Sequence, residues 1–127
     1  MRLYAAVAAG GIAGACGRVA LLELLGPAGG GWPWATFAAN LTGAFLLGYL
    51  STRLGERLAP STYRRPFLAS GLCGALTTFS TLQLELLQML RGDRVLAALA
   101  YAGSSASCCF AGLLVAVWLV RRVPVTA

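Results

Sequence analysis

The stretch from Gly71 to Leu82 reads Gly-Leu-Cys-Gly-Ala-Leu-Thr-Thr-Phe-Ser-Thr-Leu, and it interrupts an apolar run of about residues 67–90. Two glycines and four hydroxyl residues therefore lie in the middle of a segment long enough to cross a membrane. Such groups are unfavourable toward lipid and are tolerated where backbone is buried in protein or lines a cavity. We predict that this helix breaks near residues 74–78 and that a new half-helix begins near Phe79.

A break of this kind has two chemical consequences. The first half-helix ends in free carbonyl groups, which suit a small cation, whereas the second begins with free N–H groups and a positive dipole end, which favour an anion. Discontinuous membrane helices use these ends as ion sites. The alternative is a glycine-kinked packing helix whose hydroxyls bond to its own backbone. The residues alone leave both interpretations open.

Composition places the chain in a membrane. Of its 127 residues, 58% are apolar and only 11% are charged, and the mean hydropathy is +0.75. These values are typical of an all-α membrane protein and not of a soluble domain. We predict a single domain, residues 1–127, with four transmembrane helices at about residues 3–25, 33–52, 67–90 and 95–120.

Charge and cysteine usage exclude several functions. The ten basic residues are all arginines, and with four acids they give a net charge of +6. They flank the apolar runs, as expected at phospholipid headgroups, so the expected partner is the lipid bilayer and not nucleic acid. There is no histidine and no Cys-x-x-Cys pair, so no zinc site is expected. The chain also lacks a nucleophile, base and orienter set, so we expect no enzyme.

A few polar residues stand out within the other apolar runs. Asn40 either bonds a neighbouring helix or lines a pore. Arg18 follows Ala6, Gly10 and Gly14 on one helix face, and it either snorkels to the interface or points into a water-filled vestibule that draws anions.

The third and fourth spans also carry polar side chains within their apolar runs. Tyr101, Ser105 and Cys109 recur every four residues and form one polar stripe on the fourth span. Glu85 lies one turn beyond Thr81. It is either a functional intramembrane acid or an interfacial acid that caps a polar network, which Tyr101 could share.

The segment "GLCGALTTFSTLQLE" (residues 71–85) resembles the helix-break motif of the bacterial fluoride channels, the Fluc or CrcB-type family, whose pattern is close to G-x-x-G-x-x-T-T-F-S-T-F-x-x-E. The segments "GGIAGACGR" (residues 10–18) and "FAANLTGAFLLG" (residues 37–48) agree with it. Together they cover about residues 10–110 in the family's order. One departure is clear, because Leu82 stands where the family has a second phenylalanine.

The resemblance implies a fluoride-selective channel in the cell inner membrane that passively exports fluoride and lowers its cytoplasmic concentration. It implies a vestibule at Arg18, a sodium ion held by the backbone carbonyls of Gly74 and Thr77, and an antiparallel dimer with two pores. Neutral donors and a phenylalanine ring edge would replace the water around fluoride and still let the ion leave. The residues of this fluoride pathway are Asn40, Phe79, Ser80, Thr81, Ser105 and Cys109, with Cys109 where a serine is usual.

Two other functions compete with the channel. A proton-coupled small multidrug-type transporter also has four spans, but it needs an acid in the middle of the first span, where this chain has only Glu23 near the end. A non-transporting accessory subunit would leave the polar residues 77–81 without a role. Fluoride flux without a proton gradient distinguishes the channel from both.

The arginines predict a preferred orientation. With Arg18 set aside as intramembrane, seven of the other nine lie on one side of a four-span chain and two on the other, which places both termini in the cytoplasm. The antiparallel dimer requires chains in both orientations. A homodimer with dual topology is the favoured interpretation, and the alternative is a heterodimer with an oppositely oriented homologue. The seven are Arg2, Arg53, Arg57, Arg64, Arg65, Arg121 and Arg122, and the two are Arg91 and Arg94.

Overall fold

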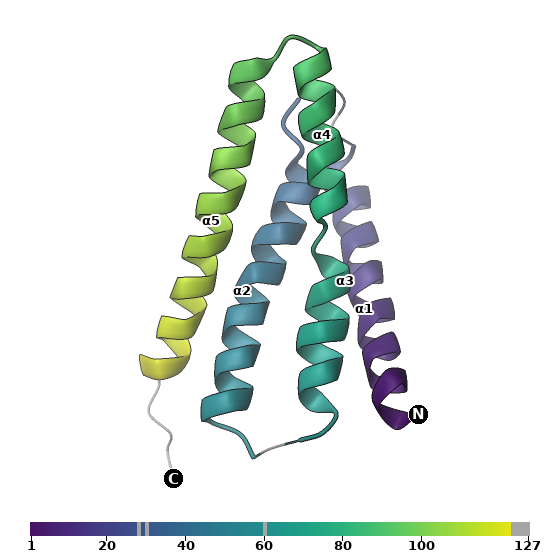
Figure 1. The fold of residues 1–127 in the computed structure, drawn as a ribbon, viewed down its shortest axis with the longest axis vertical. Helices are drawn as coiled ribbons and strands as arrows, with labels where there is room; N and C mark the ends of the chain where they lie inside the picture. Colours follow the sequence, from purple (N-terminus) through teal and green to yellow (C-terminus); the bar gives the residue numbers. More distant parts are fainter. Residues whose placement is uncertain (28, 30, 60, 123–127) are drawn as a thin grey trace.

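Four helical rods run alternately up and down, and the third is interrupted (Figure 1). The structure is a computed structural model that describes residues 1–27, 29, 31–59 and 61–122. The interrupted rod consists of η1 (Pro66–Cys73), α3 (Gly74–Leu76) and α4 (Phe79–Arg91) in succession. The elements are α1 (Arg2–Leu25), α2 (Trp34–Glu56), η1 (Pro66–Cys73), α3 (Gly74–Leu76), α4 (Phe79–Arg91) and α5 (Val95–Arg122).

The chain is all-helical within the described residues, as the composition predicts. Three helical segments are long and apolar enough to cross a membrane: Arg2–Leu25, Pro66–Arg91 and Val95–Arg122. The helix α2 also forms, but its threonines, glycines and Asn40 lower its hydropathy, and it is not among these three. It extends to Glu56, four residues beyond the predicted end of the second span.

The third rod breaks over two residues, Thr77 and Thr78. Thr77 has φ −77° and ψ 151°, and Thr78 has φ −146° and ψ 117°, so both are extended. The prediction of a new half-helix at Phe79 is confirmed. The prediction that the break includes residues 74–76 is wrong, because Gly74–Leu76 form α3 and continue the preceding helix. The π-helical winding of η1 was not predicted.

Small residues let α1 cross the third rod at backbone contact. A Cβ atom on Gly10 would overlap the carbonyl oxygen of Phe67, and one on Gly14 would overlap that of Leu72. Gly71 meets α1 from the other side, because a Cβ there would lie 2.5 Å from the carbonyl oxygen of Val7. The four-residue spacing of Gly10 and Gly14 therefore predicts this close approach correctly.

We expect Gly14→Val to disrupt the packing of α1 on the third rod. The added methyl groups would meet backbone that cannot move aside, and overpacking of this kind costs about 1–3 kcal/mol or more. The measurement is the midpoint of thermal unfolding in detergent. Gly11→Val is the matched control, because nothing lies within 4 Å of a Cβ at Gly11. Equal midpoints for the two variants would contradict the packing argument.

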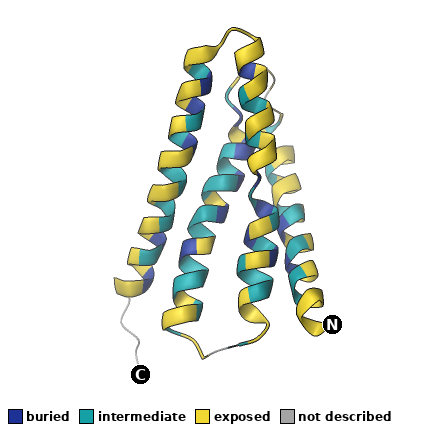
Figure 2. Cartoon of the chain, in the orientation of Figure 1, coloured by how far each residue is buried: buried dark blue, intermediate teal, exposed yellow. Residues whose placement is uncertain are grey.

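The apolar core lies toward the turn between α4 and α5. Met89, Ala98 and the fully buried Tyr101 form its centre. Leu82 packs against this cluster, and so does Trp32, whose ring meets that of Tyr101 edge to face at a centroid distance of 5.3 Å. The residues on the outer faces of the helices are largely exposed, as Figure 2 shows for the outer side of α5.

Candidate functional site

The helix break opens onto a groove bounded by α2, the third rod and α5. Its volume is about 590 Å³, and its lining is mostly apolar side chains from these elements, including Leu82, Leu86 and Leu113. Polar groups enter at the level of the break. The predicted site residues that line it are Asn40, Gly74, Thr77, Phe79, Ser105 and Cys109.

Ser105 lines this groove, and its hydroxyl oxygen is itself buried. The residue is only 4% exposed, and its Oγ atom makes no hydrogen bond of good geometry among the described residues, although the Tyr101 hydroxyl is near enough to interact with it. A buried polar atom without a hydrogen bond of good geometry is costly, so its presence in a native structure requires an explanation. Here the hydroxyl belongs to a residue that lines an open groove, so a ligand that enters the groove can accept a hydrogen bond from it.

Asn40 holds the broken backbone in place. Its Nδ2 atom donates to the carbonyl oxygen of Thr78 at 3.1 Å, and its Oδ1 atom accepts from the Thr78 N–H at 2.8 Å. One amide thus satisfies both backbone groups of Thr78, which have lost their helical partners. Asn40 therefore bonds the neighbouring third rod, at the break, and it also lines the groove, so its two possible roles are not exclusive.

The capture of the Thr78 N–H frees carbonyl groups at the end of α3. In an unbroken helix that N–H would donate to the carbonyl of Gly74, four residues earlier. The N–H of Thr81 likewise donates to Thr78 Oγ1 at 3.2 Å. Among the described residues, no hydrogen bond reaches the carbonyl oxygen of Gly74 or Thr77. Hard cations such as sodium prefer oxygen ligands, so the two groups predicted to hold sodium are chemically suited to a small cation.

Thr78 is the central hydroxyl of the break, and the sequence analysis did not select it as a site residue. Its side chain caps α4, and its Oγ1 donates to Thr81 Oγ1 at 2.9 Å and lies 3.4 Å from Ser80 Oγ. The signal was present, since threonine immediately before a helix start is a preferred cap. Ser80 itself is exposed and does not line the groove.

A second cavity, of about 300 Å³, lies on the other side of the break. Arg18 from α1, Thr36 from α2 and Thr81 from α4 line it. Thr78 lines both this cavity and the groove. The structure therefore divides the predicted pathway. Thr81 shares a cavity with Arg18, while Asn40, Phe79 and Ser105 lie on the groove.

Glu85 joins three helices through a short polar network. Its Oε1 accepts from Thr36 Oγ1 at 2.6 Å, and its Oε2 accepts from the Tyr101 hydroxyl at 2.7 Å. The structure thus brings together Glu85 and Tyr101. Thr36 was missed, and only its position one helical turn before Asn40 on α2 could have indicated it.

Phe79 and Leu82, one turn apart on α4, have different environments. Phe79 is 72% exposed and lines the groove, so its ring can contact a ligand in the groove. Leu82 also lines the groove, but it packs against the Tyr101 cluster. The leucine that stands where the resemblance expects a second phenylalanine is therefore partly buried against this cluster and also faces the groove.

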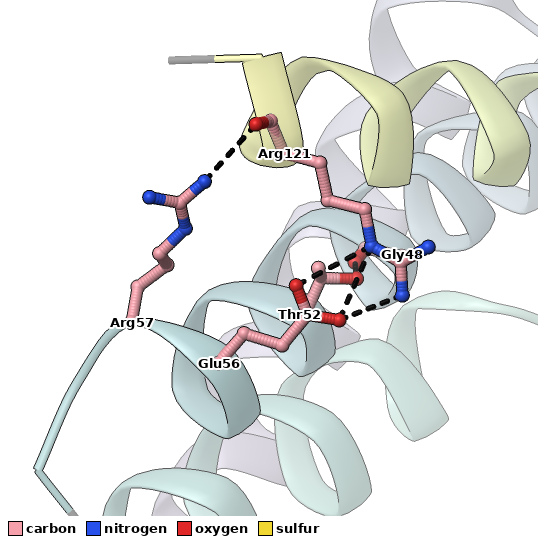
Figure 3. A network of polar contacts seen from close by, with 5 residues as sticks. All are labelled: Gly48, Thr52, Glu56, Arg57 and Arg121. Carbon is pink, nitrogen blue, oxygen red and sulfur yellow. Dashed lines mark hydrogen bonds and ion pairs between the residues drawn. The ribbon is translucent and has the colours of Figure 1, made fainter. Parts of the chain in front are cut away.

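Polar contacts also tie α2 to α5 at the end of the bundle opposite the α4–α5 turn. Arg121 Nη2 lies 2.7 Å from Glu56 Oε1, and Arg57 donates to the Arg121 carbonyl oxygen at 3.0 Å (Figure 3). Thr52 bonds back to Gly48 within α2. The hydrogen bond from Arg121 lowers the pKa of the Glu56 carboxyl. Both residues are exposed, so this contact orients the helix ends and adds little stability.

Comparison with known proteins identifies the family of this chain. A family model described as "CrcB-like protein, Camphor Resistance (CrcB)" matches residues 5–117. The chain is 50% identical over 122 residues to "Fluoride-specific ion channel FluC 1" of Mycobacterium bovis, covering 96% of this chain and 92% of the relative. It is 44% identical over 106 residues to "Fluoride-specific ion channel FluC" of Thermus thermophilus, covering 83% and 84%. The chain belongs to the CrcB-like family.

Proposed function

We propose that this protein is a fluoride-selective ion channel that passively exports fluoride from the cytoplasm and lowers its toxicity. The observation that carries the proposal is the buried hydroxyl of Ser105, which makes no hydrogen bond of good geometry, on a groove that also receives Asn40 and the exposed ring of Phe79. Relatives that align over nearly the whole chain bear the name of fluoride-specific channels, which identifies the ion. The donors are neutral, so they can bind an anion and release it again.

The pathway that we propose has two parts. Arg18 and Thr81 lie at the smaller cavity, where a positive charge would raise the local anion concentration. Ser80 and Thr81 lie near Thr78, which lines both cavities, so hydroxyls continue from one to the other. On the groove, Ser105 and the Phe79 ring edge would take over from water, and Cys109 would follow as a weak donor.

The test is fluoride efflux from liposomes that contain only this chain, read with a fluoride electrode in the absence of a proton gradient. We expect efflux in the wild type and a reduction of at least about fivefold in Ser105→Ala, which loses roughly 1 kcal/mol of hydrogen bonding to the ion. Ser105→Ala should unfold no more easily than the wild type, because it removes a buried atom that makes no hydrogen bond of good geometry.

Ser107→Ala is the matched control, since Ser107 is exposed on the same helix and does not line the groove. Efflux that requires a proton gradient and an exchanged substrate would favour the multidrug-type transporter. Absence of flux would favour the accessory subunit. Full flux in Ser105→Ala would remove this hydroxyl from the pathway.

We also propose that α2 is the fourth membrane span. Both α1 and the third rod run from the same end of the bundle to the opposite end, so the segment between them must cross back (Figure 1). With 23 residues, α2 is long enough to do so, and its charged residues, Arg53 and Glu56, lie in its last turn. The excess of arginines at the end that holds the first turn of α1 favours placing that end in the cytoplasm, and so a place in the inner membrane.

We expect sodium to stabilise the protein more than lithium or potassium does. The proposed ligands are the Gly74 and Thr77 carbonyls, which a second copy of the chain would supplement. The measurement is the melting temperature at equal concentrations of the three chlorides. In Asn40→Ala the Thr78 N–H is free to bond the Gly74 carbonyl again, so the sodium effect should shrink. Melting that is indifferent to the cation would rule out the sodium site.

What the single chain leaves uncovered supports the proposal of a dimer. The groove exposes the Phe79 ring, and nothing lies within 4 Å of a Cβ at Gly74, although this glycine has helical dihedral angles. A close approach from another molecule would explain both. We propose an antiparallel homodimer with dual topology, with a heterodimer with a homologue as the alternative.

A topology reporter at the C-terminus, read together with flux, distinguishes these assemblies. A homodimer requires C-termini on both sides of the membrane and full flux from the chain alone. A single orientation, with flux only after a homologue is added, would establish the heterodimer. A single orientation with full flux would contradict the antiparallel arrangement.

A further inference from the structure

The outer face of α5 carries a shallow groove near the end of the helix. Leu114, Val115 and Trp118 line it, its volume is about 440 Å³, and each of the three side chains is 50% exposed. Arg122 lies one turn further along the same face. Its guanidinium carbon sits 4.4 Å from the centroid of the Trp118 ring, which is within cation–π distance.

The neighbouring arginines at this helix end differ in their partners. Arg121 forms an ion pair with Glu56, and Figure 3 shows this contact together with the bond from Arg57 to the Arg121 carbonyl. Arg122 forms no ion pair with an acidic side chain among the described residues. The Trp118 ring holds its guanidinium in position and does not neutralise it, and no acidic side chain of the described residues compensates the cation at the end of the apolar groove.

This face is directed away from the proposed conduction pathway. With 3.6 residues per turn, Trp118 and Arg122 lie roughly on the opposite side of α5 from Ser105 and Cys109. The contacts of α5 with α2 are likewise on the Ser105 side, where Ala98, Ala116 and Val120 are buried. A second copy that covered the large groove would therefore leave the Trp118 face toward the lipid.

We propose that Arg122 and the groove beside it form a binding site for one anionic phospholipid. The guanidinium binds the headgroup phosphate, for which its planar donors are suited. An acyl chain lies along Trp118, Val115 and Leu114. The order of cation, indole and aliphatic side chains follows the passage from headgroup to hydrocarbon at a membrane surface. The site does not depend on which ion the protein conducts.

The experiment measures quenching of tryptophan fluorescence by brominated lipid in vesicles that contain the full chain. Every vesicle holds the same ratio of phosphatidylglycerol to phosphatidylcholine, and only one of the two species carries bromine, so the surface potential is constant. Trp118→Phe identifies the part of the signal that comes from Trp118, because Trp34 begins α2 and Trp32 directly precedes it, whereas Trp118 lies near the end of α5, and these two helix ends are at opposite ends of the bundle (Figure 1). We expect brominated phosphatidylglycerol to occupy the site about fivefold more than brominated phosphatidylcholine does.

Arg122→Gln should abolish this preference, and Arg2→Gln should retain it. Arg2 is exposed at the same end of the bundle, so its replacement removes the same charge from the same surface. Equal quenching by the two lipids would overturn the site, and so would a preference that survives Arg122→Gln or disappears equally in Arg2→Gln. Quenching that Trp118→Phe leaves unchanged would show that protein covers this face, and would also overturn the proposal.

Discussion

Replacement of Phe79 by isoleucine is expected to reduce fluoride flux by at least about tenfold, equivalent to roughly 1.4 kcal/mol at the barrier. The ring projects onto the groove and is 72% exposed in the single chain. Its edge carries the positive part of the aromatic quadrupole, which can face an anion that has lost its water. Isoleucine keeps an apolar side chain but has no such edge. The measurement is efflux from liposomes, normalised to the amount of folded protein.

The fold should tolerate this change, because an exposed side chain contributes little to packing within the chain. Phe110→Ile is the matched control, since Phe110 is 64% exposed on α5 and does not line the groove. The control should conduct like the wild type. If a well-folded Phe79→Ile protein does the same, Phe79 has no part in the pathway.

Replacement of Asn40 by aspartate is expected to have the larger effect, at least about a hundredfold on flux, since a like charge about 4 Å away costs roughly 4 kcal/mol at an effective dielectric constant near 20. The aspartate also loses the donor that meets the Thr78 carbonyl oxygen at 3.1 Å, and it places a second acceptor there. The other oxygen can still accept from the Thr78 N–H. The measurement is efflux at a pH at which the carboxylate is charged.

Asn40→Ala separates the two causes. It leaves both Thr78 backbone groups without their partner, at a cost of roughly 1–3 kcal/mol for each group that stays unpaired, but it adds no charge. We expect an intermediate flux and a lower melting temperature than for the wild type. Aspartate that conducts as well as asparagine would show that position 40 does not face the anion.

The sequence determined the class of protein and the start of the second half-helix at Phe79, but not the end of the first half-helix, which continues to Leu76. Apolar runs bounded by arginines require helices in a lipid environment, because unpaired backbone groups are too costly there. The hydroxyls from Thr77 to Thr81 predicted an end to the helix before Phe79, and threonine caps of this kind act within one turn. The spacing of Gly10 and Gly14 predicted a close helix crossing. Each of these effects depends on residues near one another in the chain.

The tertiary structure decided which polar groups meet. The choice of Thr78 as the partner of Asn40 depends on α2 lying beside the break, 38 residues away along the chain. The same holds for the network of Thr36, Glu85 and Tyr101 from three helices, and for the ion pair between Glu56 of α2 and Arg121 of α5. The sequence indicates which side chains have polar groups to satisfy. Their partners depend on helix rotation and register, which the packing of whole helices sets.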